Sequence, residues 1–144
     1  MNYEFKKVEF DNGEVSQAVI TKKKSAHDIF DYVTRAYVKG ADLIDWRLDY
    51  FEDATKMNCV IDLANQITET FPESGLLITF RSKKNGGHTE LDSEDAYLNL
   101  IKILIQFQLG DAVDIELNHT SDRVADLIKS AHQQGMRVIQ SDFG

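Results

Sequence analysis

The feature that most constrains the fold of this chain is a repeated alternation between short apolar runs and stretches with helical periodicity. The stretches between the runs place apolar side chains three or four positions apart, which is the period of an amphipathic helix. Apolar runs that alternate with such helices predict a parallel sheet covered by helices. The predicted strands of this sheet begin near residues 15, 42, 76, 112 and 136.

Capping residues and helix breakers place four helices between these strands. Ser25, Ser93 and Ser121 precede three of the periodic stretches, and serine is a favoured N-cap because its hydroxyl accepts a backbone hydrogen bond. Glycine or proline follows the last apolar position of each stretch and is expected to end the helix. These expected ends are Gly40, Pro72 with Gly75, Gly110 and Gly135.

A β-hairpin is expected before the repeated units. The extended runs 3–10 and 15–21 are separated by Asp11-Asn12-Gly13. Asn-Gly is a strong signal for a tight turn in which both residues take positive φ. We therefore expect a hairpin over residues 3–21 and βα units over residues 15–144. Residues 1–144 then form a single domain.

Composition limits the classes of partner. The chain has 144 residues, of which 42% are hydrophobic and 28% are charged, values typical of one globular domain. Its formal net charge of -8 disfavours nucleic acid and anionic membranes as partners. No apolar run reaches the roughly 18 residues of a membrane helix. A small anionic ligand remains compatible with this charge, because a local pair of arginines can bind it.

Cysteine content and the N-terminus predict a cytoplasmic protein. Cys59 is the only cysteine, so it cannot form an internal disulfide, and it fits a reducing compartment. The N-terminal sequence MNYEFKKVEF lacks the apolar segment of a secretory signal.

Two architectures fit the predicted strands. One is an open doubly wound sheet, and the other is part of a (β/α)8 barrel, which needs roughly 250 residues when complete. In both architectures the chemistry lies at the carboxyl ends of the strands. The segments at these ends are Thr21, 45–49, 81–87, 114–118 and 141–144.

Asp45, Arg47 and Asp49 close the second of these strands. Alternate residues of a strand share a face, so these three side chains are expected to point the same way. Carboxylates orient an arginine whose planar fork can then hold a carboxylate or a polyol. A structural ion pair within the sheet is an equally good interpretation.

Further polar residues close the next two strands. Thr79 and Arg81 share a face, which favours a single anion site with Arg47, although an exposed strand-end arginine would look the same in sequence. Asp114 and Glu116 also share a face, and two buried carboxylates require a cationic partner. Either arginine can fill that role, and a supporting function is expected for the two acids.

Other potential sites lack the required spacing. The loop 83–88 contains Gly86-Gly87 but not the pattern of a phosphate-binding loop. His27, His88, His119 and His132 show no metal-ligand spacing with one another, so no metal is expected.

Three segments at the strand ends resemble the type I 3-dehydroquinate dehydratases. They are GADLIDWRLDYFE (40–52), LLITFRSKKNGG (76–87) and AVDIEL (112–117), and the tail QQGMRVIQSDFG resembles the strand that follows in that family. The resemblance implies a (β/α)8 TIM barrel, here a partial barrel of about five parallel strands with an N-terminal hairpin. It also implies dehydration of 3-dehydroquinate to 3-dehydroshikimate in the shikimate pathway. A lysine Schiff base and a general-base histidine carry out that reaction without a cofactor.

The resemblance also assigns roles to single residues. Arg47 and Arg81 would bind the carboxylate or hydroxyls of 3-dehydroquinate. Asp45 stands in place of a substrate-contacting glutamate, and Thr21 lies near a serine that touches substrate. Asn85 replaces a glutamate that many members carry. Asp114 matches an acid that supports the catalytic histidine.

The C-terminal segment departs from the family pattern. The family reads roughly S-x-H-D-F after its fifth strand, whereas this chain reads Ser141-Asp142-Phe143-Gly144 and contains no histidine there. No lysine matches the Schiff-base position. We therefore expect a truncated chain, whether a cut fragment, a frameshift or an early stop, that binds substrate without accelerating its reaction.

A partial barrel also has consequences for association and for alternative functions. Its open sheet edges invite pairing with another chain, so a homo-oligomer is expected. A non-enzymatic open α/β module that binds or senses a metabolite is the alternative, and another Schiff-base barrel lyase is a third. Strand order separates the first two, because a barrel fragment keeps its strands in sequence order.

Overall fold

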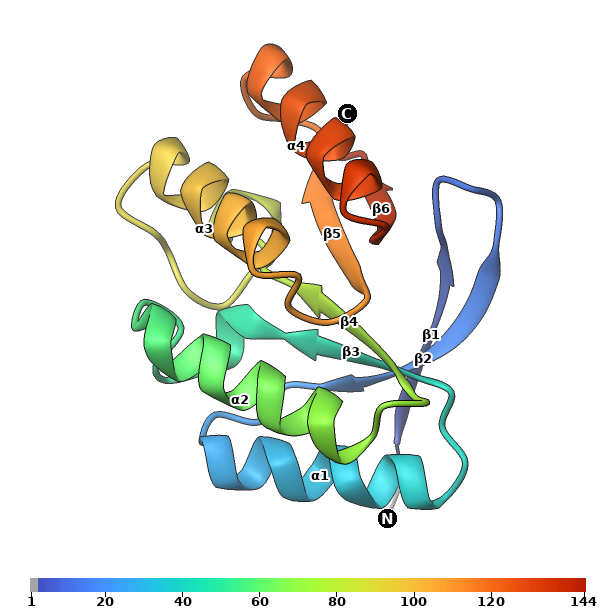
Figure 1. The fold of residues 1–144 in the computed structure, drawn as a ribbon. Helices are drawn as coiled ribbons and strands as arrows, with labels where there is room; N and C mark the ends of the chain where they lie inside the picture. The colour runs from blue at the N-terminus through green and yellow to red at the C-terminus, as the bar shows by residue number, and fades with distance from the viewer. Residues whose placement is uncertain (1–2) are drawn as a thin grey trace.

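The computed structural model describes residues 3–144 and shows a curved sheet with helices on its outer face (Figure 1). Five parallel strands form most of the sheet, and β1 (Glu4–Glu9) pairs antiparallel with the first of them. The parallel strands are β2 (Val15–Thr21), β3 (Leu43–Arg47), β4 (Gly75–Thr79), β5 (Ala112–Glu116) and β6 (Arg137–Ser141). The helices between them are α1 (Ala26–Val38), α2 (Met57–Thr70), α3 (Glu94–Gln106) and α4 (Ser121–Gln133).

The strands follow one another in sequence order, β1-β2-β3-β4-β5-β6. A doubly wound sheet would reverse its order at a switch point and carry helices on both faces. The expectation of a partial (β/α)8 barrel is therefore confirmed, and the doubly wound alternative is wrong.

The two faces of the sheet differ in character. Most side chains that face the helices are apolar and belong to the larger core, as Ile44, Trp46 and Ile78 do. The inner face is apolar only at the beginnings of the strands, where Leu43 and Leu77 pack against the hairpin. At the carboxyl ends the same face becomes polar. This alternation follows the two-residue period of a strand and gathers the polar groups at one end of the half-barrel.

The hairpin turn differs from the prediction in one detail. Gly13 has φ 90°. Gln108 is the only non-glycine residue within 3–144 that has a positive φ, so Asn12 does not take one. The amide of Phe10 donates to Glu14 O at 2.9 Å, and the amide of Gly13 donates to Phe10 O at 2.9 Å. The loop is thus one residue longer than a two-residue turn, and only its last position requires glycine.

The hairpin tip reaches the far edge of the sheet. The amide of Asp11 donates to Val138 O in β6 at 2.7 Å, and Gln140 Nε2 donates to the carboxylate of Asp11 at 3.0 Å. His132 of α4 lies 2.8 Å from the same carboxylate oxygen. The hairpin therefore spans the open end of the curved sheet and holds its first and last strands together.

Most helix limits agree with the predicted caps. Ser25 Oγ accepts from Asp28 N, and Ser93 Oγ accepts from Ala96 N, both at 3.1 Å. The prediction that Ser121 caps the last helix is wrong, because Thr120 is the N-cap and Ser121 is the first helical residue. Gly75 also begins β4 rather than ending α2.

Two strands are shorter than predicted. The strand predicted to begin near residue 42 and to close at residues 45–49 is β3, which stops at Arg47, and Leu48–Tyr50 form a short 3-10 helix, η1. The predicted strand over 76–81 is replaced by β4, which stops at Thr79. A second 3-10 helix, η2, follows at Lys83–Asn85. Asp49 therefore lies in η1, and Arg81 lies in the loop just beyond β4.

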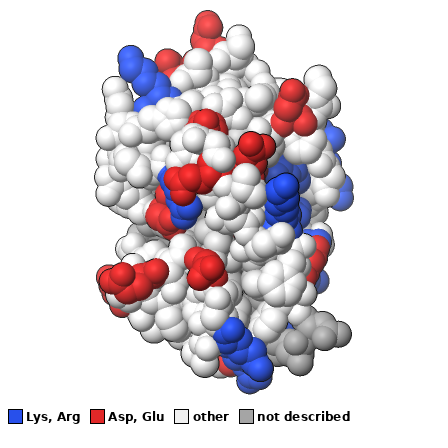
Figure 2. All heavy atoms as spheres, turned by 90° about the vertical axis from the view of Figure 1, so that its right-hand side faces the viewer, with Lys and Arg blue, Asp and Glu red and all other residues white. Residues whose placement is uncertain are grey.

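The surface on the side of the hairpin carries mixed charges. Figure 2 shows acidic and basic side chains interspersed among uncharged ones on the right-hand side of the view in Figure 1. No helix within residues 3–144 has both the length and the apolar character to cross a membrane.

Candidate functional site

Polar side chains gather at one end of the inner face, and we call this group the polar rim. Its members are buried or half-buried and come from β3, β4, β5, β6, η1 and the loop that follows β4. The polar rim comprises Asp45, Arg47, Asp49, Thr79, Arg81, Asp114, Glu116 and Ser141.

Asp45 lies deepest in the polar rim. Its side chain is fully buried, and Thr79 Oγ1 donates to its Oδ1 at 2.7 Å. Its other oxygen has no hydrogen-bond partner among residues 3–144. Burial raises the pKa of Asp45 to about 6, despite the hydrogen bond from Thr79, which acts to lower it. Near neutral pH this carboxyl group can therefore accept a hydrogen bond or, when protonated, donate one.

Asp49 connects the two arginines. Arg47 Nε and Nη2 donate to its two carboxylate oxygens, each at 2.9 Å. The backbone amides of Arg81 and His88 also donate to this carboxylate, at 3.2 and 2.9 Å. Burial acts to raise the pKa of Asp49, but the bonds from Arg47 and His88 outweigh it, so the pKa is lowered. A permanent carboxylate therefore fixes Arg47 beside the chain segment that carries Arg81.

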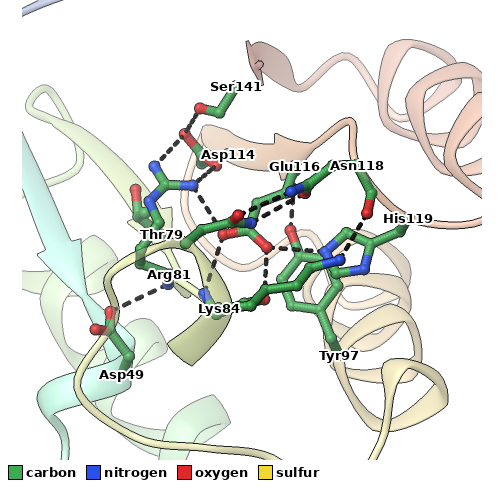
Figure 3. Close-up of polar contacts among 12 residues, drawn as sticks. Asp49, Thr79, Arg81, Lys84, Tyr97, Asp114, Glu116, Asn118, His119 and Ser141 are labelled. Carbon is green, nitrogen blue, oxygen red and sulfur yellow. Dashed lines mark hydrogen bonds and ion pairs between the residues drawn. The ribbon is translucent and has the colours of Figure 1, made fainter. Parts of the chain in front are cut away.

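The Arg81 guanidinium is held on its other side by two carboxylates (Figure 3). Its Nη1 and Nη2 donate to the two oxygens of Asp114, both at 3.1 Å, and Nη1 also donates to Glu116 at 3.0 Å. The expected pairing of these acids with an arginine is confirmed. The ring of Phe143 lies 4.8 Å from the guanidinium carbon. These contacts orient the Arg81 guanidinium, and its Nε takes part in none of them.

A glycine allows the loop after β4 to fold against Arg81. A Cβ atom on Gly87 would lie 1.7 Å from the backbone oxygen of Arg81, a distance that no side chain can accept. The amide of Gly87 donates to Ser82 O at 2.9 Å, which closes this loop. The Gly86-Gly87 pair therefore shapes the loop that carries Arg81.

Glu116 lies between Arg81 and a residue that the sequence did not identify. His119 Nε2 is 2.8 Å from Glu116 Oε1, and the amide of Ser82 donates to Glu116 Oε2 at 3.0 Å. Burial acts to raise the pKa of Glu116, but the hydrogen bonds from Ser82 and His119 outweigh it and lower the pKa. The spacing of His119 three residues after Glu116 was the only sequence signal for this contact.

Two predicted site residues lie outside this network. The hydroxyl of Thr21 accepts from the amide of Lys23 at 3.3 Å, and in the register of the sheet Thr21 lies beside Trp46 rather than Asp45. Asn85 exchanges two side-chain hydrogen bonds with Asn118, at 3.0 and 2.8 Å. Neither residue shares a hydrogen bond with Arg47, Arg81 or Asp45 in the described chain.

The C-terminal strand adds one contact to the polar rim. Ser141 Oγ donates at 2.6 Å to Asp114 Oδ2, the oxygen that also accepts from Arg81 Nη2. Within residues 3–144, no group of three or more His, Cys, Asp or Glu side chains is arranged to hold a metal ion. The polar rim thus offers oriented cations, a titratable carboxyl and hydroxyls, which suits an anionic polyol.

Comparison with known proteins identifies the family. The model of type I 3-dehydroquinase matches residues 17–143. The 3-dehydroquinate dehydratase of Klebsiella pneumoniae is 35% identical over 137 residues, and that of Clostridium novyi is 39% identical over 101 residues. A solved structure, the 3-dehydroquinate dehydratase of Enterococcus faecalis, superposes with a TM-score of 0.80 at 32% identity and covers 85% of this chain.

The alignments also show how much of each relative is represented. The two matches cover 95% and 70% of this chain, but only 54% of the Klebsiella protein and 40% of the Clostridium protein. The match covers 51% of the Enterococcus chain. This chain therefore spans about half the length of the relatives that it matches. The half-barrel, the sequential strand order and the family-model match lead to one conclusion: the chain belongs to the type I 3-dehydroquinase family.

Proposed function

We propose that the polar rim anchors 3-dehydroquinate, the substrate of the shikimate-pathway enzyme that this chain resembles. The observation that carries the proposal is the position of Asp49, whose one carboxylate binds both the Arg47 guanidinium and the Arg81 backbone. Asp49 thus orients the guanidinium of Arg47 and fixes the backbone that carries Arg81, whose own guanidinium Asp114 and Glu116 orient. An oriented guanidinium binds a carboxylate through two parallel hydrogen bonds.

The remaining groups of the polar rim suit the hydroxyls of such a substrate. Asp45 has one oxygen without a partner among residues 3–144 and a pKa of about 6. It can therefore accept from a substrate hydroxyl or donate to a substrate oxygen. Thr79 holds the other oxygen of Asp45 and fixes its orientation. We assign Thr21 to the same site by family resemblance alone.

We further propose that residues 1–144 on their own bind this substrate without dehydrating it. Aligning the D-F of the family pattern S-x-H-D-F with Asp142-Phe143 places Ser141 where the general-base histidine would stand. Ser141 donates to Asp114, the acid assigned to support that histidine. A neutral hydroxyl cannot replace an imidazole as a base near neutral pH.

The amine for a Schiff base is also missing from the parallel strands. None of β2 to β6 contains a lysine. Lys6 of β1 is exposed but close enough to Asp45 to lower its pKa, and Lys84 Nζ of η2, also exposed, donates to Asn118 O at 2.7 Å. A charged, solvated amine is a poor nucleophile toward a ketone.

The experiment is a binding measurement combined with a covalent trap. Calorimetry with 3-dehydroquinate is expected to show binding to the wild-type protein. Arg47→Lys, which keeps the charge but loses the planar fork, is expected to weaken that binding by roughly tenfold. Arg123→Lys, on the exposed surface of α4, is the matched control and should bind like wild type. Absence of binding by the folded wild-type protein would refute the anchoring role.

Borohydride reduction in the presence of 3-dehydroquinate tests the second part. A reduced Schiff base would add the mass of the substrate less one oxygen atom, because imine formation releases water and reduction adds two hydrogens, whereas the proposal predicts an unchanged mass. It also predicts no appearance of 3-dehydroshikimate by ultraviolet absorbance. The alternative function, a non-enzymatic metabolite-binding module, is favoured by the Ser141–Asp114 contact. A lysine adduct or product formation would contradict both the proposal of binding without dehydration and the alternative of a non-enzymatic module.

We also propose self-association through β6 and a cytoplasmic location. The Arg137 amide and the Ser141 carbonyl bond to the β5 side. The backbone groups of Val138 and Gln140 therefore point to the opposite edge. Asp11 occupies that edge only at Val138. Light scattering that finds only monomers at high concentration would contradict the association.

A further inference from the structure

His119 is a buried titratable residue that the proposed anchoring function does not use. Its side chain is only 3% exposed, and its ring stacks on Tyr97 with ring centroids 4.4 Å apart. Its two nitrogens face carboxylates on different elements. Nε2 lies 2.8 Å from Glu116 of β5, and Nδ1 lies 3.2 Å from Glu94 of α3. His119 therefore bridges the helix layer and the polar rim.

The hydrogen-bond chemistry of this bridge depends on the proton count of His119. Ionised carboxylates only accept hydrogen bonds, and a neutral imidazole can donate from only one of its nitrogens. The Nε2 contact has hydrogen-bond geometry, whereas Nδ1 is buried without a hydrogen-bond partner among residues 3–144. A neutral Nδ1 presents its lone pair to the carboxylate of Glu94. A protonated Nδ1 would instead donate to it, so protonation converts a repulsion into an attraction.

Glu116 connects this proton to the anion site. Its Oε1 contacts His119, while its Oε2 accepts from Arg81 Nη1 at 3.0 Å. The hydroxyl of Ser82 donates to the same carboxylate as the imidazole. A charge on the imidazole draws the Glu116 carboxylate toward it and away from the guanidinium. Arg81 is then less neutralised by the acids around it and attracts an anionic ligand more strongly.

Other charged groups surround the same position. His119 lines a cavity of about 230 Å³ together with Lys83 and Lys84 of η2, and with Glu90 and Asp92 of the loop before α3. Opposite charges in this cavity offset one another in part. Burial holds the pKa of Tyr97 well above its ordinary value, so its ring stays neutral. His119 is therefore the group beside Glu116 that carries a charge only when it is protonated.

We propose that His119 is a positioning residue whose protonation, transmitted through Glu116, strengthens the attraction of Arg81 for an anionic ligand. The identity of the ligand rests on the proposed function, whereas the link between His119 and Arg81 does not depend on it. Affinity for 3-dehydroquinate is then higher at acid pH. We expect the affinity to fall roughly fivefold as the pH rises from about 5.5 to about 7.5. A factor of this size corresponds to the loss of the attraction between the ligand and one unit charge within about 10 Å.

The link itself is tested without ligand, by NMR of the Arg81 Nε–H signal as a function of pH. In the wild-type protein this signal should shift in step with the His119 imidazole signals. In His119→Gln, which keeps a donor for Glu116 but cannot titrate, the step should vanish. His132→Gln removes an exposed histidine paired with Asp11 and should retain it. The Asp45→Asn background removes the other group expected to titrate near pH 6.

Two results would overturn the proposal. One is an Arg81 signal that does not follow the imidazole in the wild-type protein. The other is a step of unchanged size in His119→Gln, with His119→Asn as the second variant if the first does not fold. Binding of 3-dehydroquinate at both pH values supplies the functional reading, and its pH dependence should be smaller in His119→Gln than in the wild-type protein, because only Asp45 is then expected to titrate near pH 6. If no binding is seen at any pH, the anchoring function fails, while the ligand-free NMR titration still decides whether His119 and Arg81 are linked.

Discussion

At the scale of single residues, the polar rim is a row of buried charges that stabilise one another. Asp49, Arg81 and Glu116 each contact a group of opposite charge or a backbone amide. Burying any one of them alone would be unfavourable, because the free-energy cost of desolvating an unpaired ion is larger than the free energy that its other contacts would gain. The group therefore acts as a unit, and a substitution in one member changes its neighbours.

Replacing Arg81 tests this mutual dependence. Arg81→Gln would leave Asp114 and Glu116 buried without their shared cation, and we expect a loss of about 3–5 kcal/mol in the free energy of unfolding. Arg123→Gln breaks an exposed ion pair with Asp95, and the expected loss is about 1 kcal/mol or less. Urea unfolding at neutral pH compares the two. Equal losses would show that the Arg81 cluster does not stabilise the fold.

Asp45 gives a prediction about pH. Its folded-state pKa of about 6 exceeds its ordinary value of 3.8, so folding favours the protonated acid. The associated stability is fully present below about pH 3.8 and is lost as the pH rises through about 6. The loss is on the order of 3 kcal/mol by linkage. Asp45→Asn should remove this slope, measured as the free energy of unfolding at several pH values between 4 and 7.5. A variant with the wild-type slope would contradict the assignment.

At the scale of elements, the hairpin is the part that holds the two ends of the sheet together. Asp11 joins its tip to β6 and α4 through one backbone bond and two side-chain contacts. This arrangement covers part of an edge that would otherwise be open to another chain. The polar rim lies at the opposite ends of the strands from the hairpin tip, although Lys6 of β1 is close enough to Asp45 to lower its pKa.

Asp11→Ala isolates this role. It removes the acceptor for Gln140 and His132 but leaves the backbone bond, and the expected cost is about 1 kcal/mol of stability. Hydrogen exchange at the amide of residue 11 should also become faster, because the tip separates more readily from β6. Asp126→Ala removes the same charge from an exposed position on α4 and should leave both quantities unchanged. An effect of equal size in the control would assign the change to net charge alone.

The elements were predictable because each has a local signal. The apolar periodicity of residues 26–38 and the cap at Ser25 identify α1 without any tertiary information. The ends of β3 and β4 were not predictable from sequence. They are set by a tertiary contact beyond both strands, in which the backbone amide of Arg81 donates to the side chain of Asp49. Ser121 was assigned as a cap because sequence does not show that Glu94 binds Thr120 and fixes the helix start there.

The site was predictable only in part, for the same reason. Arg47 and Arg81 stand out because each is a charged residue at the end of an apolar run. His119 carries no such signal, because its contacts with Glu94 and Tyr97 depend on how α3 packs against β5. Thr21 was grouped with the arginines from its position at a strand end. The register instead places it beside Trp46.

At the scale of the whole molecule, the chain is a half-barrel whose polar groups are gathered at one end. The net charge of -8 would repel an anion, but the two arginines lie where carboxylates orient them. Family membership and fold follow from the whole chain, whereas the function proposed here depends on these two side chains. The most direct test is therefore the location of the bound substrate.

A crystal structure of the protein with 3-dehydroquinate provides that measurement. The account predicts a substrate carboxylate or hydroxyl within hydrogen-bond distance of both Arg47 and Arg81, on the inner face of β3 and β4. A substrate bound elsewhere on the molecule, or a polar rim that stays empty at saturating concentration, would contradict it.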